Sequence, residues 1–275
     1  MPIIENLRKR FQRTESDGIE FRCNICGTHN KLPLEPLARE AGFCAHCGST
    51  VRMRSIIDLL TSELLHKSKA LPDIKHPHLN ICGIGMSCAG GYAEPLSNIF
   101  NYTNTFYHQE PLLDITNIDP ALESTLDFII SSDVFEHVLP PVSKAFENAY
   151  KLLKPNGVFV FTVPYGYPGE TRVPTLEHFP DLHEYEILMQ DGKRILRNVT
   201  RNGEVQQFDN LIFHGGDGTT LEMRQFSESS ILEELKNAGF ERIKIQDREK
   251  PEYGIAWQYP WSLPMTARKP RKTAS

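Results

Sequence analysis

The stretch "LDFIISSDVFEHV", residues 126–138, decides the fold that this sequence predicts. It starts as an apolar run, stops at two serines, and then presents Asp133, Glu136 and His137 in close succession. Continuous apolar runs of this kind are typical of strands buried on both faces of a parallel sheet. Ligands of such sheets bind beyond the carboxyl ends of the strands. We therefore expect these three ionisable groups to face a ligand site.

The segments around this strand alternate between strand and helix patterns. Apolar or β-rich runs predict strands at residues 79–85, 102–108 and 158–165, and an amphipathic period predicts a helix at 142–157. Farther on, Ser227 is the expected N-cap of a helix that ends at Gly239 and leads into a strand. This alternation predicts an α/β fold, a Rossmann-like, doubly wound and mostly parallel sheet.

Composition indicates an ordinary globular protein. The 275 residues are 40% hydrophobic and 24% charged, and no apolar run approaches the length of about 20 residues that spans a bilayer. The N-terminus lacks the apolar core of a signal peptide, so a cytoplasmic location is expected. A net charge of −5 disfavours a nucleic-acid binder, although basic clusters occur in "LRKRFQR" and "RKPRK" near the two ends.

Four of the six cysteines form two C-x-x-C pairs separated by seventeen residues: Cys23, Cys26, Cys44 and Cys47. Zinc prefers four soft ligands in a tetrahedron, and this double spacing is typical of zinc sites. Because four thiolates fill the coordination sphere, the metal is expected to be structural. Cys82 and Cys88 lie outside the pattern and are expected to be small buried hydrophobes.

The segment "STLDFIISSDVFEHV…AFENAYKLLKPNGVFVFTVP" resembles the region between the fourth and fifth strands of class I S-adenosylmethionine-dependent methyltransferases. The resemblance covers about residues 79–165, with weaker support at 226–247. It implies a methyltransferase that uses S-adenosylmethionine, and it does not name the methyl acceptor. The "C-x-x-C-G-S-x-x-R-x-R" segment is also similar to methyltransferases found with glycan and natural-product pathways.

The expected cofactor site starts at Gly83 and Gly85, where a glycine turn lets the backbone approach a ligand. The family pattern has an acidic residue before G-x-G-x-G, whereas this chain has Ile81 there and Ser87 at the third glycine. A carboxylate after the second strand binds ribose hydroxyls in dinucleotide folds, which makes Glu110 a candidate, although an exposed loop acid is an equal interpretation.

The resemblance adds four further residues to the cofactor site. It implies that Asp114 accepts from the adenine amino group, that Ile115 packs on the ring, and that Ser132 and Asp133 line the pocket near the methionine moiety.

His137 is the candidate catalytic residue, because a hydroxyl acceptor needs a base to take its proton. A structural histidine is the competing interpretation. A third hypothesis is that Asp133, Glu136 and His137 hold a divalent ion, as the "E-x-x-E-H" cluster of ubiquinone-pathway O-methyltransferases does, and so activate the acceptor.

An insertion at about residues 166–225 follows the fifth strand and is expected to cover the acceptor pocket. Asn202-Gly203 in it is a strong hairpin signal. Candidate acceptor contacts are Tyr165, His214, Glu222 and Arg224.

The expected organisation is an N-terminal segment (1–20), a zinc ribbon (21–52), a connecting helix and linker (53–75), a methyltransferase domain (76–262) and a basic tail (263–275). The leading hypothesis for function is methyl transfer to a hydroxyl of a carbohydrate or another small molecule. One alternative is an RNA methyltransferase that grips its substrate with the ribbon, aided by a basic patch of Arg52, Arg54 and the N-terminal "RKRFQR". Another is an interaction protein that has lost catalysis. We expect no membrane binding, and the sequence leaves the oligomeric state open.

Overall fold

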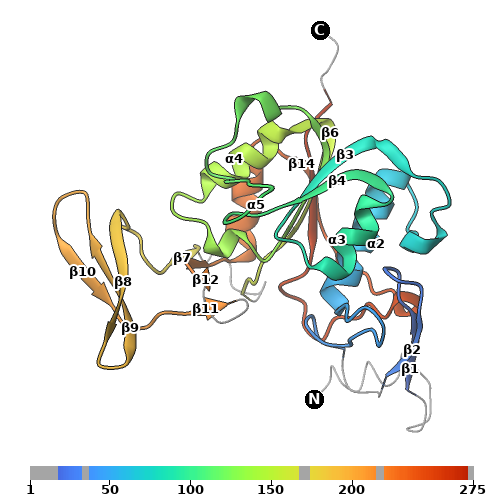
Figure 1. Ribbon diagram of the computed structural model, residues 1–275, viewed down its shortest axis with the longest axis horizontal. Helices are drawn as coiled ribbons and strands as arrows, with labels where there is room; N and C mark the ends of the chain where they lie inside the picture. Colours follow the sequence, from blue (N-terminus) through green and yellow to red (C-terminus); the bar gives the residue numbers. More distant parts are fainter. Residues whose placement is uncertain (1–17, 33–36, 167–173, 215–219, 272–275) are drawn as a thin grey trace. The chain divides into compact units, whose positions relative to one another are not determined.

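The computed structural model describes residues 18–32, 37–166, 174–214 and 220–271 (Figure 1). The chain divides into two compact units. Unit 1 contains the described residues up to Asn80 together with 89–101 and 246–260, and unit 2 contains 81–88, the described residues of 102–245, and 261–271. The expected domain of residues 76–262 is therefore interrupted, because segment 246–260 belongs with the N-terminal residues.

Unit 1 is built from short elements around the cysteines. Strands β1 (Ile19–Arg22) and β2 (His29–Leu32) form an antiparallel hairpin, and the helices are α2 (Val51–Leu65), α3 (Gly90–Ser97) and the 3-10 turns Leu71–Asp73 and Pro251–Tyr253. Thr50 caps α2 by accepting from the Met53 amide. Helix α2 is tied to segment 246–260 by Arg54, which is fully buried and donates to the carbonyl oxygens of Tyr253 and Gly254.

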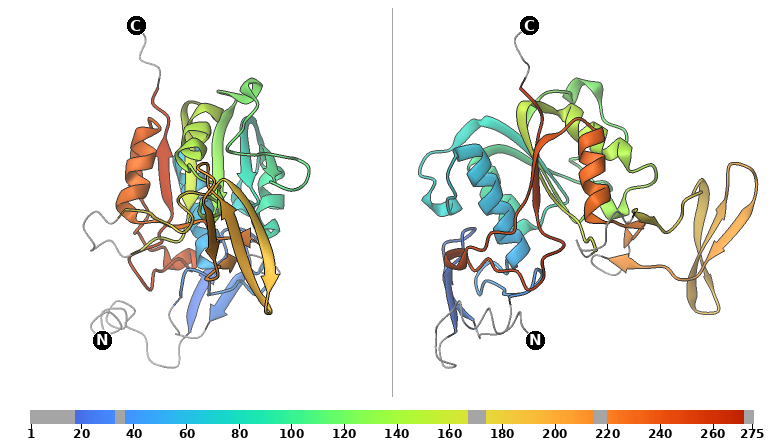
Figure 2. Two further views of the ribbon diagram at one scale, coloured as in Figure 1. Left: turned by 90° about the vertical axis from the view of Figure 1, so that its left-hand side faces the viewer. Right: turned by 180° about the vertical axis from the view of Figure 1, so that it is seen from behind.

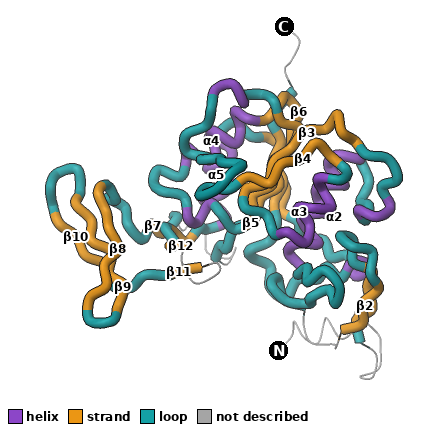
Figure 3. The backbone as a smooth tube through the Cα atoms, in the orientation of Figure 1, coloured by secondary structure: helices purple, strands orange, loops and turns teal. Residues whose placement is uncertain are grey.

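Unit 2 holds most of a six-stranded sheet with the order β14-β15-β6-β5-β3-β4. Strands β3, β4, β5 and β6 of this sheet are labelled in Figure 3. Its strands are β3 (His78–Met86), β4 (Phe100–Thr105), β5 (Leu126–Ser132), β6 (Leu153–Thr162), β14 (Glu241–Ile245) and β15 (Met265–Arg268). Strands β3, β5 and β6 are parallel, whereas β15 is antiparallel to both of its neighbours. The predicted α/β fold with its mostly parallel sheet is confirmed, and the sheet is mixed because β15 runs antiparallel to its neighbours.

The expected basic tail is wrong for its first residues, because β15 lies inside the sheet. Met265 and Ala267 are 1% exposed, and β15 pairs with Phe161 to Val158 of β6. Arg268 and Lys269 then donate to the carbonyl oxygens of Asn156 and Tyr150. A four-residue strand has too little period to be recognised alone, so only its pairing with β6 and β14 reveals it.

Helices α4 (Ser143–Leu152) and α5 (Glu228–Asn237) lie side by side on one face of this sheet (Figure 2). Phe146 of α4 and Ile231 and Leu235 of α5 are fully buried in the main core with Phe159 and Phe161 of β6. The prediction for α5 is confirmed: Ser227 is the N-cap in a capping box, and the chain turns at Gly239. Helix α4 ends earlier than predicted, at Leu152, because β6 begins at the next residue.

The glycine turn is placed differently from the prediction. Gly83 and Gly85 are paired strand residues, opposite Phe128 and Ile130 of β5, and β3 continues to Met86. A Cβ on Gly83 would lie 2.3 Å from the Phe128 ring, and one on Gly85 would lie 2.0 Å from the Tyr102 hydroxyl. Neighbouring aromatic side chains therefore occupy the space that a side chain would need at either position, and the assignment of both glycines as cofactor contacts stays a prediction.

Replacing Gly85 with alanine is expected to destabilise unit 2 by about 1–3 kcal/mol, because the new methyl overlaps Tyr102 and the Cys88 sulfur. Urea unfolding measures the change. The matched control is Gly166→Ala, since nothing lies within 4 Å of a Cβ there; it is expected to stay within about 0.5 kcal/mol of the native protein. Equal stability of the two variants would contradict the packing argument.

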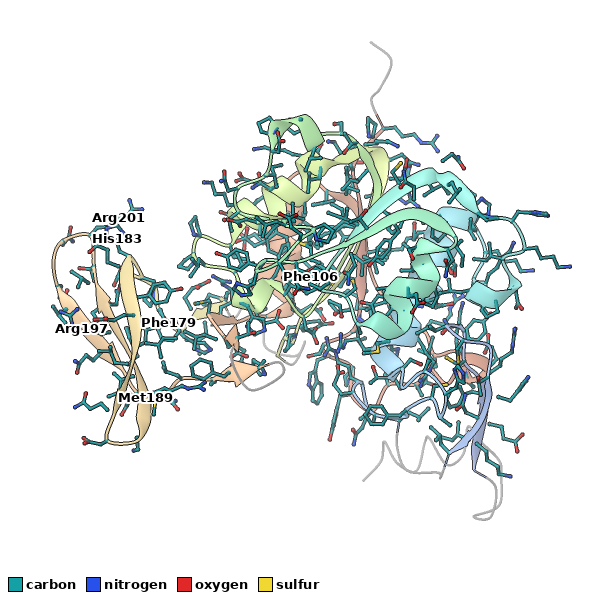
Figure 4. All side chains as sticks on the ribbon, in the orientation of Figure 1. Phe106, Phe179, His183, Met189, Arg197 and Arg201 are labelled. Atoms are coloured by element: carbon teal, nitrogen blue, oxygen red, sulfur yellow. The ribbon has the colours of Figure 1, made fainter. Side chains whose placement is uncertain are left out.

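The insertion forms its own small sheets. Strands β8 (Glu184–Gln190), β9 (Lys193–Val199) and β10 (Val205–Phe208) make a three-stranded sheet on which Met189 and Arg197 are seen (Figure 4), and the hairpin predicted at Asn202-Gly203 joins β9 to β10. The pairs β11 (Phe213–His214) with β12 (Thr220–Leu221) and β7 (Leu176–Glu177) with β13 (Arg224–Gln225) follow. None of the helices in the described ranges is long and apolar enough to cross a bilayer.

Candidate active site

The carboxyl ends of β5 and β6 meet in a polar group around Thr162. Its hydroxyl donates to Ser132 Oγ at 3.1 Å and to Asp133 Oδ1 at 3.0 Å, and its carbonyl oxygen accepts from the Asp133 amide. Asp133 has a φ of 55°, a left-handed conformation that is uncommon for a residue other than glycine. The structure thus brings Ser132 and Asp133 together at the sheet edge, and Thr162 joins them without having been singled out by the sequence.

The turn that follows β3 is held by a side chain from β4. Asn104 Oδ1 accepts from the Cys88 amide and its Nδ2 donates to the Cys88 carbonyl, both at 2.9 Å. Ser87 occupies a left-handed conformation with a φ of 51°, and its amide donates to the Thr105 carbonyl at 2.7 Å. Ser87 and Asn104, rather than Gly83 and Gly85, therefore shape the turn at the sheet edge.

Three other predicted cofactor residues lie after β4. Glu110 is exposed and accepts from the Leu112 amide at 3.0 Å. Asp114 is half-buried and accepts from the amide and hydroxyl of Thr116. The Ile115 side chain is 5% exposed in the main core, so it is not available to pack on a bound ring, and this part of the prediction is wrong.

The structure separates the groups of the hypothetical divalent-ion cluster. Glu136 is 2% exposed, and its Oε1 lies 3.8 Å from His137 Nε2, while Asp133 is engaged by Thr162. Within the described residues, the four cysteines are the only group of three or more potential ligands whose ligand atoms come within 4.8 Å of one another. The arrangement gives the divalent-ion hypothesis no support.

His137 is held by strand β12 of the insertion. Its Nδ1 lies 2.9 Å from the Leu221 carbonyl, which fixes the tautomer with the proton on Nδ1 and leaves Nε2 with a lone pair. Burial lowers the pKa of His137, with the nearby His214 acting in the same direction, while the Leu221 carbonyl opposes it. The ring is therefore neutral at neutral pH and can accept a hydrogen bond.

The lowered pKa of His137 makes stability depend on pH. The unfolded chain, with an ordinary value of 6.5, binds the proton first, so the native protein loses stability as the pH falls below that value. We expect the native protein to lose up to about 1.4 kcal/mol per pH unit relative to His137→Gln in this window. Urea unfolding at a series of pH values measures it, and parallel curves for the two proteins would contradict it.

A second polar group lies in the insertion next to His137. Glu222 Oε1 lies 2.9 Å from His178 Nε2, and Glu222 Oε2 lies 2.6 Å from His214 Nε2. The rings of His137 and His214 are 5.6 Å apart between centroids. The sequence singled out Glu222 and His214 separately, but no local pattern indicated His178, which follows β7 and meets Glu222 only in the fold.

Two of the predicted acceptor contacts are buried instead. Arg224 is 0% exposed and donates to the carbonyl oxygens of Phe135 and Val138 and to Glu177. Tyr165 is 3% exposed, and its hydroxyl accepts from the amide of Leu263. Both residues therefore anchor the structure under the site, and the predictions that they contact the acceptor are wrong.

The cysteine cluster has the geometry of a tetrahedral metal site. Cys23 Sγ lies 3.7 Å from Cys47 Sγ, and Cys26 Sγ lies 3.5 Å from Cys44 Sγ. A tetrahedral zinc ion with Zn–S bonds of about 2.3 Å requires sulfur separations of about 3.8 Å. The glycine after each pair donates back to the first cysteine, with a positive φ at Gly27 and at Gly48. The four residues thus fit zinc.

The surroundings favour a thiolate at Cys44, whereas burial raises the pKa of Cys23 and raises that of Cys47 to about 12. Burial opposes ionisation of Cys44, but backbone amides of Cys47 and His46 outweigh it and lower its pKa to about 6. The Asn30 amide adds a hydrogen bond to the same sulfur at 3.5 Å. The buried guanidinium of Arg54 supplies positive charge near the four sulfurs.

The arginines of the expected basic patch that the structure describes form hydrogen bonds within the protein. Arg54 is fully buried, and Arg52 pairs with Glu40 through two hydrogen bonds of 2.6 and 2.9 Å. The N-terminal "RKRFQR" lies outside the described residues. These contacts give no support to the RNA alternative, because phosphate binding requires exposed cations.

The sheet order, with β15 inserted antiparallel beside β6 and a polar edge at the ends of β5 and β6, defines the class I fold of S-adenosylmethionine-dependent methyltransferases. A family model described as a methyltransferase domain matches residues 74–245, more than half of the chain, and the chain belongs to this family. It is a methyltransferase that depends on S-adenosylmethionine. No curated protein matches it.

Several solved structures are similar in fold at low identity. A 1,6-didemethyltoxoflavin N1-methyltransferase from Burkholderia thailandensis is 19% identical, with 78% of this chain and 81% of that chain covered and a TM-score of 0.40. An amino pentose methyltransferase of calicheamicin biosynthesis from Micromonospora echinaspora is 13% identical (78% and 89%, TM-score 0.42). A sugar N-methyltransferase from a Streptoalloteichus species is 10% identical (79% and 86%, TM-score 0.43). Likeness at this level carries no conclusion about the acceptor.

Proposed function

We propose that the protein transfers the methyl group of S-adenosylmethionine to a hydroxyl of a carbohydrate or another small molecule. The observation that carries the proposal is the edge of unit 2 at which β5 and β6 end. Ser132 and Asp133 are hydrogen-bonded there to the Thr162 hydroxyl, near the neutral imidazole of His137. A polar, partly buried edge with a neutral nitrogen base suits a hydroxyl acceptor better than a polyanion.

In this proposal the cofactor lies along the ends of β3 and β5. Ser132 and Asp133 line the site near the methionine moiety, Asp114 accepts from the adenine amino group, and Glu110 binds the ribose hydroxyls. When bound, the cofactor supplies a methyl group that is already activated by its sulfonium, so the protein mainly aligns the acceptor with it. His137 is the candidate catalytic residue, and its unprotonated Nε2 is available for a hydrogen bond from the bound acceptor.

We further propose that the four cysteines bind zinc in a structural role. The cysteines lie in two short turns, each closed by a backbone hydrogen bond from the glycine that follows it, and metal binding supplies folding free energy to such small modules. Four sulfur ligands fill the tetrahedral coordination sphere of the zinc ion, which leaves no open position for catalysis.

Calorimetric titration of the purified protein with S-adenosylmethionine tests the cofactor assignment. We expect saturable binding of one equivalent, weakened in Asp133→Asn, because that change removes a carboxylate from the edge. Incubation with methyl-labelled cofactor and a cell extract then tests the acceptor class. Label in polar small molecules supports the proposal, whereas nuclease-sensitive label would replace it with the RNA alternative, and absence of cofactor binding would leave the non-catalytic one.

A further inference from the structure

Glu222 holds two imidazoles at once, one on each carboxylate oxygen. His178 lies on Oε1 at 2.9 Å and His214 on Oε2 at 2.6 Å. The three side chains differ in exposure: Glu222 is 12% exposed, His178 is 20% exposed and His214 is 45% exposed. The carboxylate is therefore shielded from water, while the ring of His214 remains accessible to a ligand.

This cluster is fixed to the chain that follows β5. The Met223 amide donates to the Glu136 carbonyl at 2.8 Å, and His137 Nδ1 contacts the Leu221 carbonyl at 2.9 Å. The pairing of His214 with Thr220 then places the His214 ring 5.6 Å from the ring of His137. Backbone contacts on both sides of Glu222 thus hold the cluster at the sheet edge to which the proposed function assigns the acceptor.

The hydrogen bonds also define which ring nitrogen of His214 is free. A carboxylate only accepts hydrogen bonds, so the nitrogen that lies on Glu222 carries the proton. Nδ1 of His214 is then the unprotonated nitrogen, and no partner for it occurs among the described residues. An imidazole with one nitrogen on a carboxylate is oriented by it and stabilised when the other nitrogen takes up a proton.

His137 lacks this arrangement. Its Nδ1 lies on a carbonyl rather than a carboxylate, and burial lowers its pKa, which disfavours the imidazolium. Its side chain is 14% exposed, against 45% for His214. Of the two neighbouring rings, His214 is therefore the better proton acceptor, and His137 is better suited to orient the acceptor.

We propose that His214 is the general base of the transfer and that Glu222 and His178 position it. The acceptor oxygen forms a bond to the methyl carbon as the carbon–sulfur bond breaks and its electron pair stays on sulfur. The acceptor proton moves to His214 Nδ1 and is later released to water. Among the described residues, the charged and titratable groups next to the ring are Glu222 and His178 from the insertion and His137 from the β5 side, and Asp133 acts on His137. The inference rests on the proposed methyl transfer.

Transfer of labelled methyl to the small-molecule fraction of a cell extract tests the base. His214→Ala is expected to lower kcat/KM by about 100-fold or more, and Glu222→Gln by a smaller factor, since loss of a general base costs about 10²–10⁴-fold. The acid limb of the pH profile of kcat/KM should disappear in His214→Ala. The control is His183→Ala, an exposed imidazole of the same insertion (Figure 4), with unchanged transfer expected.

Two measurements separate this inference from the proposed function. Nitrogen-15 NMR of the protein without cofactor should show His214 protonated at Nε2, and this tautomer should lose its preference in Glu222→Gln. Calorimetry should show native affinity for S-adenosylmethionine in His214→Ala. Transfer and a pH profile unchanged in His214→Ala, or the opposite tautomer in the native protein, would overturn the assignment of the base. A native protein that transfers no methyl would overturn the proposed function, and the base assignment with it.

Discussion

Replacing Cys44 with serine is expected to unfold unit 1 and to abolish its metal content. The two cysteine pairs bring four sulfurs within 4.8 Å of one another, and a bound cation stabilises the thiolates that hold it. Because structural zinc contributes about 10–16 kcal/mol of apparent binding free energy in small zinc modules, its loss should exceed the stability of this unit. Metal analysis combined with circular dichroism and limited proteolysis measures the outcome.

The matched control for this change is Cys82→Ser. Cys82 lies outside the cluster, at the start of the central sheet, and is fixed through its backbone amide, which donates to Asp127 at 2.8 Å. Zinc content is expected to stay at one equivalent in this variant. A Cys44→Ser protein that keeps its metal, or a metal-free native protein with unchanged proteolysis and spectrum, would contradict the structural role.

Replacing Arg224 with methionine is expected to cost about 3–5 kcal/mol of the free energy of unfolding. The change keeps the apolar bulk but removes the donors to Glu177, Phe135 and Val138. The partly exposed Glu177 carboxylate and two carbonyl groups then lose a partner, and a buried group is costly to leave unsatisfied. Urea unfolding measures the change. Because Arg224 ties the chain after β5 to the insertion, methyl transfer is expected to fall as well.

Arg197→Met is the control, since Arg197 pairs with Glu186 at 3.5 Å on the exposed three-stranded sheet. Exposed ion pairs contribute about 0–1 kcal/mol, so this variant should remain close to the native protein. If both arginine variants lost the same small amount of stability, the hydrogen bonds of the buried Arg224 would not contribute the expected free energy of unfolding.

The sequence predicted those parts of the structure that depend on neighbours along the chain. The cysteine cluster follows from two local turns, and helix α5 follows from its capping box at Ser227 and its end near Gly239. Strand β5 and the polar residues after it follow from an apolar run that ends abruptly. In each case residue type and spacing along the chain are sufficient, even for the cysteines, whose two turns meet across the seventeen residues between them.

Other features required contacts between distant segments. Gly83 and Gly85 have the composition of a turn, but pairing with β5 extends β3 beyond both. The strand β15 is recognisable only once β6 and β14 lie on either side of it.

The sequence by itself determined the fold class, the cysteine cluster and the sheet edge to which the proposed function assigns the site. Only the tertiary structure decided which polar residues meet there: Glu222 with His178 and His214, and His137 with the strand before Glu222. It also buried Arg224 and Tyr165, which sequence reasoning had placed in the acceptor pocket. The physical reason is that the sequence around a polar residue is the same whether its side chain forms hydrogen bonds to water, to a ligand or to a buried carbonyl group. Only the packing of the folded chain decides which of these partners the side chain has.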